Sequence, residues 1–264
     1  MRGKSTYIIL ITFLIVFCIF MIFLYGKGVF TKDKNELVLM VGDNTIWYSK
    51  DKKWFYVSSR EDIDKLNWNN YYVYMDNNYF GNYYMWHDDK WYLFKEDKTA
   101  VLYEGELLAY KYQNSKKKMS VGNIKIENDV NQDFINKVLI DNNITDISEE
   151  EYSVKHKASF DFDNDNNLED FYIISNAFSN SISSNTVFSI VFMVDDGNIT
   201  YIYQNVDTIK SFSGCKPFFR SFIDVDQDKT YELVLSCGRY STDEEIDMLY
   251  QYKNGDFKIL ISNQ

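Results

Sequence analysis

The sequence predicts a mainly β protein that follows one N-terminal transmembrane helix. Residues 36–114 are short aromatic and β-branched runs interrupted by Asp, Asn, Lys and Gly, which is the pattern of strands and hairpins. Residues 158–264 contain the same unit twice, an acidic loop followed by an apolar strand and a hairpin. Clear helical periodicity in the globular part is confined to a short stretch near residues 131–140.

The first expected element is an apolar run without a charged side chain from Tyr7 to Tyr25. At about 1.5 Å per residue, a helix of this length nearly crosses a bilayer core of about 30 Å. The terminal tyrosines suit the membrane interface, and the following residues lack the small-residue site at which a signal peptide is cut. The pattern predicts a single-pass signal anchor in the cell membrane, with residues 1–6 cytoplasmic, residues 26–35 as a spacer, and an extracytoplasmic C-terminal domain.

The composition narrows the classes of partner. The formal net charge is −11, so phosphate backbones and anionic lipid surfaces are repelled and we expect no nucleic-acid partner. The chain is 45% hydrophobic and 18% aromatic, which suffices for a packed core. Cations are the natural counterpart of such a chain.

The β-rich region over residues 36–114 contains two similar hairpins, Trp47–Tyr56 and Trp86–Tyr92, each with a charged turn between aromatic strands. These rings either fill the faces of the sheet or form an exposed platform that binds sugars or peptides. We favour the first interpretation, because aromatic residues are ordinary constituents of sheet cores. Residues 58–68 are the one segment of this region that favours a helical turn.

Residues 115–157 are predicted to link the two β regions. A basic break, SKKK, opens the linker at residues 115–118. Phe134, Ile135, Val138 and Leu139 recur at helical spacing, which predicts a short amphipathic helix over residues 131–140. The acidic stretch at residues 146–151 is interpreted as a solvated connector.

The two copies of the C-terminal unit begin near Phe160 and Phe222. In each copy an apolar strand follows the acidic loop, and the hairpin after it turns at Asp196-Gly197 or Asn254-Gly255, pairs that favour two-residue turns. One such unit cannot bury its own face, so a repeat of about 60 residues predicts a propeller-like or sandwich-like β architecture.

The acidic loops predict two cation sites. Ca²⁺ takes about six to eight oxygen ligands, and a tight loop with acids at alternate positions turns its carboxylates inward. The alternative is a metal-free acidic turn held by its own hydrogen bonds. We predict Ca²⁺ as the cofactor, with the candidate ligands Asp161, Asp163, Asp165, Asn167 and either Glu169 or Asp170 in the first loop, and Asp224, Asp226, Asp228, Thr230 and Glu232 in the second.

Neither loop is an EF-hand, because the twelfth position is Tyr172 or Leu235 instead of Glu and a strand follows. The pattern D-x-D-x-D-x-x-x-E before an apolar strand resembles the calcium loops of FG-GAP/VCBS-type repeats, as in integrin-α-like β-propellers. This resemblance covers the C-terminal ~100 residues only, and it implies blade-like β units, loop-bound Ca²⁺ and a binding role. The chain departs from the family at the sixth loop position, which is Asn166 or Lys229 instead of Gly. Because Lys adopts the left-handed conformation at a cost, the first site is expected to be the stronger.

Two cysteines, Cys215 and Cys237, lie beyond the predicted anchor. Oxidising compartments favour a disulfide between them, whereas two buried free thiols are the alternative. Pairing needs Cα atoms within about 7 Å, which the sequence does not show.

No enzyme motif occurs in the chain. The HExxH, GxSxG, P-loop and CxxC patterns are absent, and the two histidines, His87 and His156, are expected at exposed strand or turn positions. We therefore expect a non-enzymatic, membrane-anchored extracytoplasmic binding protein whose partner is a protein or a cell-envelope polymer. The alternative is a cell-wall or carbohydrate-binding module that uses the aromatic N-terminal sheet.

Overall fold

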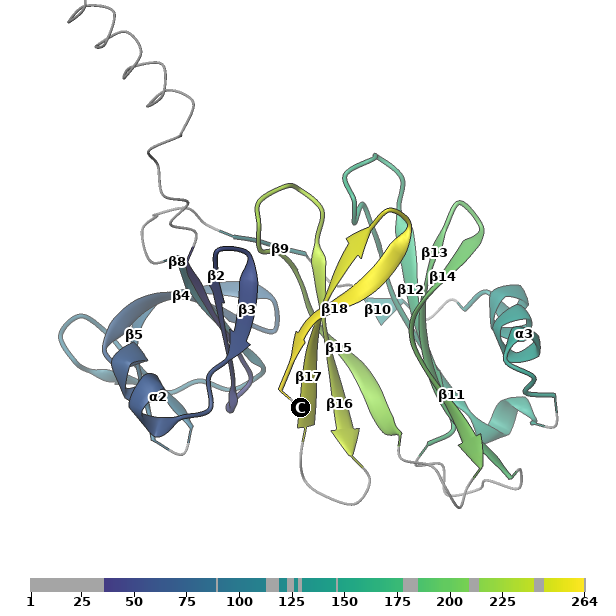
Figure 1. The fold of residues 1–264 in the computed structure, drawn as a ribbon, viewed down its shortest axis with the longest axis horizontal. Coiled ribbons are helices and arrows are strands. Elements are labelled where there is room, and N and C mark those ends of the chain that lie inside the picture. The colour runs from purple at the N-terminus through teal and green to yellow at the C-terminus, as the bar shows by residue number, and fades with distance from the viewer. Residues whose placement is uncertain are drawn as a thin grey trace, which may run out of the picture.

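The computed structural model describes residues 36–88, 90–112, 119–122, 126–127, 130–145, 147–177, 185–208, 214–239 and 245–263. This part of the chain is mainly β, as predicted, and three antiparallel sheets follow one another across the molecule (Figure 1). The predicted anchor at Tyr7–Tyr25 lies outside the described residues. Within those residues, no helix combines the length and apolar character needed to cross a membrane.

The N-terminal sheet has eight strands in the order β3-β2-β1-β8-β4-β5-β6-β7. The predicted hairpins are confirmed as the pairs β2–β3 and β5–β6. The expected helical turn is α2 (Arg60–Leu66), whose Asp62 N donates to the capping Ser59 Oγ at 3.2 Å. The strands are β1 (Leu37–Val41), β2 (Thr45–Lys50), β3 (Lys53–Tyr56), β4 (Asn69–Met75), β5 (Asn78–His87), β6 (Trp91–Phe94), β7 (Ala100–Val101) and β8 (Leu107–Tyr112).

The predicted duplication is confirmed as two four-stranded antiparallel meanders. We call the first, with β10, the outer sheet and the second, with β9, the middle sheet. The outer sheet contains β10 (Ile126–Glu127), β11 (Ser153–Phe160), β12 (Glu169–Ser175), β13 (Thr186–Asp195) and β14 (Asn198–Thr208). The middle sheet contains β9 (Ser120–Val121), β15 (Cys215–Asp224), β16 (Glu232–Arg239), β17 (Glu245–Lys253) and β18 (Asp256–Ser262). The first unit begins at Ser153, ahead of the expected boundary at residue 158.

The two-residue turns of both meanders have the predicted backbone conformation. The φ angles are 46° and 78° at Asp196-Gly197 and 56° and 80° at Asn254-Gly255. Positive φ at both central residues gives the turn a twist that matches the flanking strands. The Asp51-Lys52 turn in the N-terminal sheet has the same signs, 51° and 61°, without a glycine.

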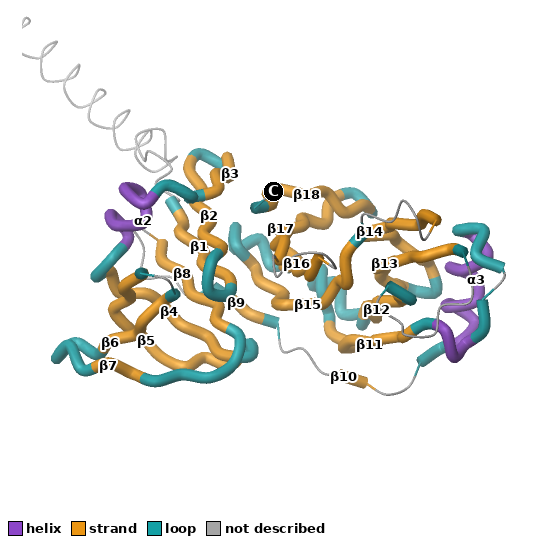
Figure 2. Tube along the Cα trace, turned by 90° about the horizontal axis from the view of Figure 1, so that it is seen from below, coloured by secondary structure: helices purple, strands orange, loops and turns teal. Residues whose placement is uncertain are grey.

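The predicted amphipathic helix is α3 (Gln132–Asp141), which lies on the outer sheet (Figure 2). Its buried residues Ile135, Val138 and Leu139 pack into the same cluster as side chains of β12 and β13. The acidic connector after it differs from the expectation. Residues Glu149–Glu151 form a 3-10 turn (η1), in which Glu151 is buried and its Oε2 accepts a hydrogen bond from Ser148 N at 2.9 Å.

The middle sheet is covered on both faces. On β16, Leu233, Leu235 and Cys237 face the outer sheet, whereas Val234 faces the N-terminal sheet. This double burial explains why β16 reads as a nearly continuous apolar run. Cys215 and Cys237 lie in the core between the two meanders and form a disulfide with a Cα–Cα distance of 5.3 Å, so the structure contains the bridge instead of two free thiols.

Candidate cation sites

The two acidic loops lie next to each other along the upper edge of the molecule in Figure 1. The first connects β11 to β12 and the second connects β15 to β16. Tyr231 N, at the end of the second loop, donates to Phe162 O in the first at 3.0 Å, and the Tyr231 and Phe160 rings are 5.4 Å apart. The sequence predicted both loops, but their proximity arises from the packing of the meanders.

Three carboxylates converge in each loop. Asp161, Asp163 and Glu169 each offer an oxygen, and these atoms lie within 4.8 Å of one another. The equivalent residues Asp224, Asp226 and Glu232 meet the same distance criterion. A Ca²⁺ ion about 2.3–2.6 Å from each ligand fits oxygens spaced this closely.

The other candidates stabilise the turns. Asp165 Oδ1 accepts from Asn167 N at 2.7 Å, and Asp228 Oδ1 accepts from Thr230 N at 2.8 Å. Asp165 and Asp228 are exposed and lie outside the two clusters. Asp170 lies on β12 opposite Val194 and outside the first cluster. Of the two closing residues that the sequence left open, the structure brings Glu169 to the cluster.

Glu169 and Glu232 are the buried members of the clusters, each only 1% exposed. Glu232 Oε2 accepts from Val225 N at 2.9 Å, and Glu169 Oε2 accepts from the equivalent Phe162 N. Burial raises the pKa of Glu169 to about 7 and that of Glu232 to about 8, and the charges of neighbouring aspartates add to the shift. Among the described residues, these two carboxyl groups therefore have too little positive charge beside them to offset their burial.

Several carboxylate oxygens in the two clusters have no hydrogen-bond partner among the residues that the structure describes. Asp163 Oδ1, Glu169 Oε1 and Asp224 Oδ1 are buried and unpaired within the described part of the chain. Most buried polar atoms in native proteins are paired. Because these oxygens converge with other carboxylates, they are available to coordinate a hard cation that prefers oxygen ligands.

Asp195 is a further candidate ligand that sequence reasoning missed. It ends β13, and its Oδ1 is also buried without a hydrogen-bond partner among the described residues. Burial raises the pKa of Asp163, and the charges of Asp165 and then Asp195 raise it further. In the sequence, Asp195 is marked as a candidate ligand only by being an acidic residue immediately before the Asp-Gly turn. The equivalent position in the second unit, before its Asn-Gly turn, is the exposed Lys253.

The backbone follows the same path in both loops. The sixth position has a positive φ in each, 74° at Asn166 and 78° at Lys229, as the resemblance leads one to expect. The fourth position also does, at 64° for Asn164 and 65° for Gln227. The second loop therefore keeps this path with Gln and Lys, for which positive φ is unfavourable.

The expectation that both histidines are exposed is not confirmed. His87 is buried and packs edge-on against Trp91 at 4.7 Å, so the prediction of an exposed residue was wrong. The side chain of His156 lies outside the described residues.

Trp47 and Trp91 belong to the core, whereas Trp68 is 49% and Phe80 41% exposed. The backbone N–H of Trp68 donates to the carbonyl of Met85 near the end of β5, whereas Phe80 lies near the start of that strand. These two exposed rings therefore do not form one platform.

In comparisons with known proteins, no family model, no curated protein and no solved structure matches this chain.

Proposed function

We propose that this chain is a non-enzymatic binding protein, anchored in the cell membrane through Tyr7–Tyr25, whose extracytoplasmic sheets are stabilised by Ca²⁺ in both acidic loops. One observation carries the calcium assignment. Each loop gathers two aspartates around a glutamate that is 1% exposed. A buried carboxylate beside two further carboxylates is unfavourable unless protons or a cation neutralise it.

Calcium fits these ligands better than the common alternatives. The clusters offer carboxylate oxygens and no Cys or His, whereas zinc sites usually contain Cys or His. Mg²⁺ requires nearly ideal octahedral geometry and keeps most of its water, but Ca²⁺ accepts irregular shells of about six to eight oxygens. Backbone oxygens and water would complete such shells in these loops.

The position of the loops suggests what the ion does for the protein. In the first loop a cation would join the β11–β12 connection, and through Asp195 it would also hold the β13–β14 hairpin. Tyr252 of the middle sheet lies close enough for Asp195 and Asp163 to raise the pKa of its hydroxyl, after the larger effect of burial. Calcium would therefore stabilise the contact between the two meanders.

We propose a protein or a cell-envelope polymer as the partner of the ectodomain. The alternative, a carbohydrate-binding module, draws support from the Trp68 and Phe94 rings, whose centroids are 5.0 Å apart. Binding to purified cell-wall polymer would support the alternative. Capture of a discrete membrane protein that depends on calcium would support the first proposal.

Calorimetric titration with CaCl₂ tests the cation sites directly. The purified chain is expected to bind two ions, and Glu169→Gln and Glu232→Gln should each remove one. Glu104→Gln is the matched control, because Glu104 is exposed and distant in sequence from both loops. Absence of binding, or two sites of unchanged affinity in both loop variants, would overturn the assignment.

Protease treatment of intact cells tests the proposed anchor. Protease added outside should digest the three sheets while the N-terminal segment stays in the membrane fraction. Protection of residues 36–264 in intact cells would contradict the proposed topology.

A further inference from the structure

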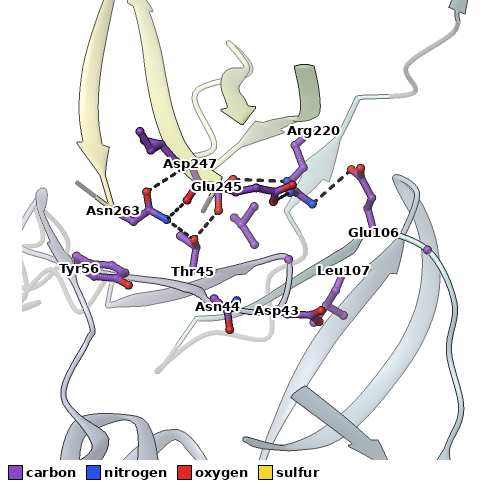
Figure 3. Close-up of a pocket in the computed structure, with 14 residues that line it drawn as sticks. Asp43, Asn44, Thr45, Tyr56, Glu106, Leu107, Arg220, Glu245, Asp247 and Asn263 are labelled. Carbon is purple, nitrogen blue, oxygen red and sulfur yellow. Dashed lines mark hydrogen bonds and ion pairs between the residues drawn. The ribbon is translucent and has the colours of Figure 1, made fainter. Parts of the chain in front are cut away.

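A polar cavity of about 1010 Å³ lies between the N-terminal sheet and the middle sheet (Figure 3). The N-terminal sheet contributes Asp43 in the β1–β2 turn and Glu106 just before β8, and the middle sheet contributes Arg220 and Glu245. Glu245 pairs with Gly238, at the end of β16 that is remote from the acidic loop. The cavity is therefore separate from the two cation sites.

The back wall of the cavity is a buried hydrogen-bond network. Arg220 Nε donates to Ser236 Oγ at 2.7 Å, and the hydroxyl groups of Ser236 and Thr45 both donate to the Asp247 carboxylate. Asn263 Nδ2 donates to Thr45 Oγ1 at 2.8 Å. These groups hydrogen-bond to one another across the two sheets. The bonds fix their positions, so this wall of the cavity is preorganised.

The open side of the cavity carries two partly exposed carboxylates, both within ion-pair distance of Arg220. The side chains of Glu106 and Glu245 are 46% and 50% exposed, and they lie 3.6 Å and 2.5 Å from Arg220 Nη1 and Nη2. Asp43 is exposed in the turn opposite. With Asp247, four carboxylates line a cavity that contains one arginine, which leaves an excess of three negative charges.

This charge excess favours a cation, and the spacing favours an organic one. An anion would meet more carboxylates than guanidinium groups. A single metal ion is also disfavoured, because no three carboxylates of this cavity belong to a group of oxygens within 4.8 Å in the part of the chain that is described. The volume is of the order that accommodates a small organic ligand. Val41, Leu107 and Ile246 add apolar surface to the lining.

We propose that the cavity binds a ligand with an alkylammonium group, held by Glu106 and Glu245. An ammonium group has three hydrogen-bond donors and no acceptor, so carboxylates on opposite walls can share it while the alkyl chain contacts the apolar lining. Free diamines and the lysine side chains of peptides both present this group.

Calorimetric titration of the purified full-length chain, in saturating calcium, tests this proposal with two probes. Cadaverine represents a free diamine, and the blocked tripeptide acetyl-Ala-Lys-Ala-amide represents a lysine side chain. Saturable binding of one equivalent is expected for at least one probe, and the tighter probe identifies the source of the amine. The neutral analogue 1-pentanol should not bind.

The variant Glu106→Gln/Glu245→Gln should weaken binding of the tighter probe at least tenfold. Glu104→Gln, which removes one charge close to Glu106 but outside the lining, should leave it unchanged. Asp43→Asn, in the exposed turn, is a second variant that should weaken binding if the double variant does not fold. Asp163→Ala in the first acidic loop should have no effect. Absence of binding by both probes, or equal weakening in Glu104→Gln and the cavity variants, would overturn the proposal.

Discussion

Glu169 and Glu232 are the side chains on which the proposed calcium sites depend most. Removal of a carboxylate from water without a counter-charge costs on the order of several kcal/mol, so protonation is favoured and the pKa rises. Both pKa values are raised mainly by burial. A bound cation would supply the counter-charge and would keep the two groups ionised.

Protons and calcium are expected to compete at the second loop. The pKa of Glu232 is raised from 4.5 to about 8, so this carboxyl group is mainly protonated at neutral pH when calcium is absent. The contribution of this group to the stability of the calcium-free protein is therefore greatest below about pH 4.5, decreases as the pH rises and is lost above about pH 8. Calcium must displace this proton to bind the ionised carboxylate. The calcium affinity of the second loop should therefore increase between about pH 6 and about pH 8.5, which calcium titrations in weakly buffered solution would show.

The matched variant for this competition is Glu232→Gln, which cannot ionise. It should lose the proton release that accompanies calcium binding to the second loop. Proton release equal to that of the unmodified chain would show that another group is responsible.

The first loop should contribute more to calcium binding than the second. It has Asn166 at the sixth position and Asp195 beside the cluster, whereas the second loop has Lys229 and, at the position equivalent to Asp195, Lys253. Asp163→Ala is therefore expected to abolish most of the calcium-binding heat and Asp226→Ala much less. The reverse order of effects would contradict this assignment.

Lys229→Gly should strengthen the second site. Lys229 has a φ of 78°, which costs a non-glycine residue about 1–2 kcal/mol, and its charge repels a cation. Removal of the positive charge should lower the calcium dissociation constant of this loop several-fold in a calorimetric titration, whereas relief of the backbone strain should stabilise the loop with or without the ion. Asn166→Gly is the comparison and should change the first site less, because asparagine tolerates positive φ better and carries no charge. Unchanged affinity in Lys229→Gly would show that this residue does not limit the site.

The strands, the helix and the turns could be predicted because each of them depends on residues that are close together in the sequence. The aromatic runs became strands, the spacing of Ile135, Val138 and Leu139 produced α3, and the glycine turns formed as expected. The short strands β9 and β10 carry too few residues to show a period. Asp195 was missed because only strand pairing brings the end of β13 beside the first loop.

The disulfide between β15 and β16 should stabilise the middle sheet. Cys215 and Cys237 are separated by 22 residues, and closure of such a loop in the unfolded chain contributes about 3 kcal/mol on the chain-entropy estimate. Cys215→Ala/Cys237→Ala should lower the free energy of unfolding by up to that amount in urea denaturation. An unchanged urea midpoint and slope would contradict a stabilising bridge.

At the scale of the whole molecule, the order of the layers could not be predicted. The repeat indicated two similar units, but nothing in the sequence shows that the N-terminal sheet covers the second face of the middle sheet. That contact buries Leu39, Tyr110, Val234 and Leu249 in one cluster. The cavity that contains Arg220 and Glu106 arises from the same contact, between residues far apart in the chain. No local sequence pattern predicts it.

The dependence of the melting temperature on calcium tests whether the acidic loops bind the ion. A ligand at tenfold to hundredfold excess over its dissociation constant stabilises the folded state by about 1.4–2.7 kcal/mol per site, and extracellular calcium modules bind at ~10⁻⁴–10⁻³ M. The purified chain should therefore melt several degrees higher in about 10 mM CaCl₂ than in chelator, and Glu169→Gln/Glu232→Gln should lose most of this shift. An identical melting temperature in calcium and in chelator would show that the acidic loops are turns that bind no calcium.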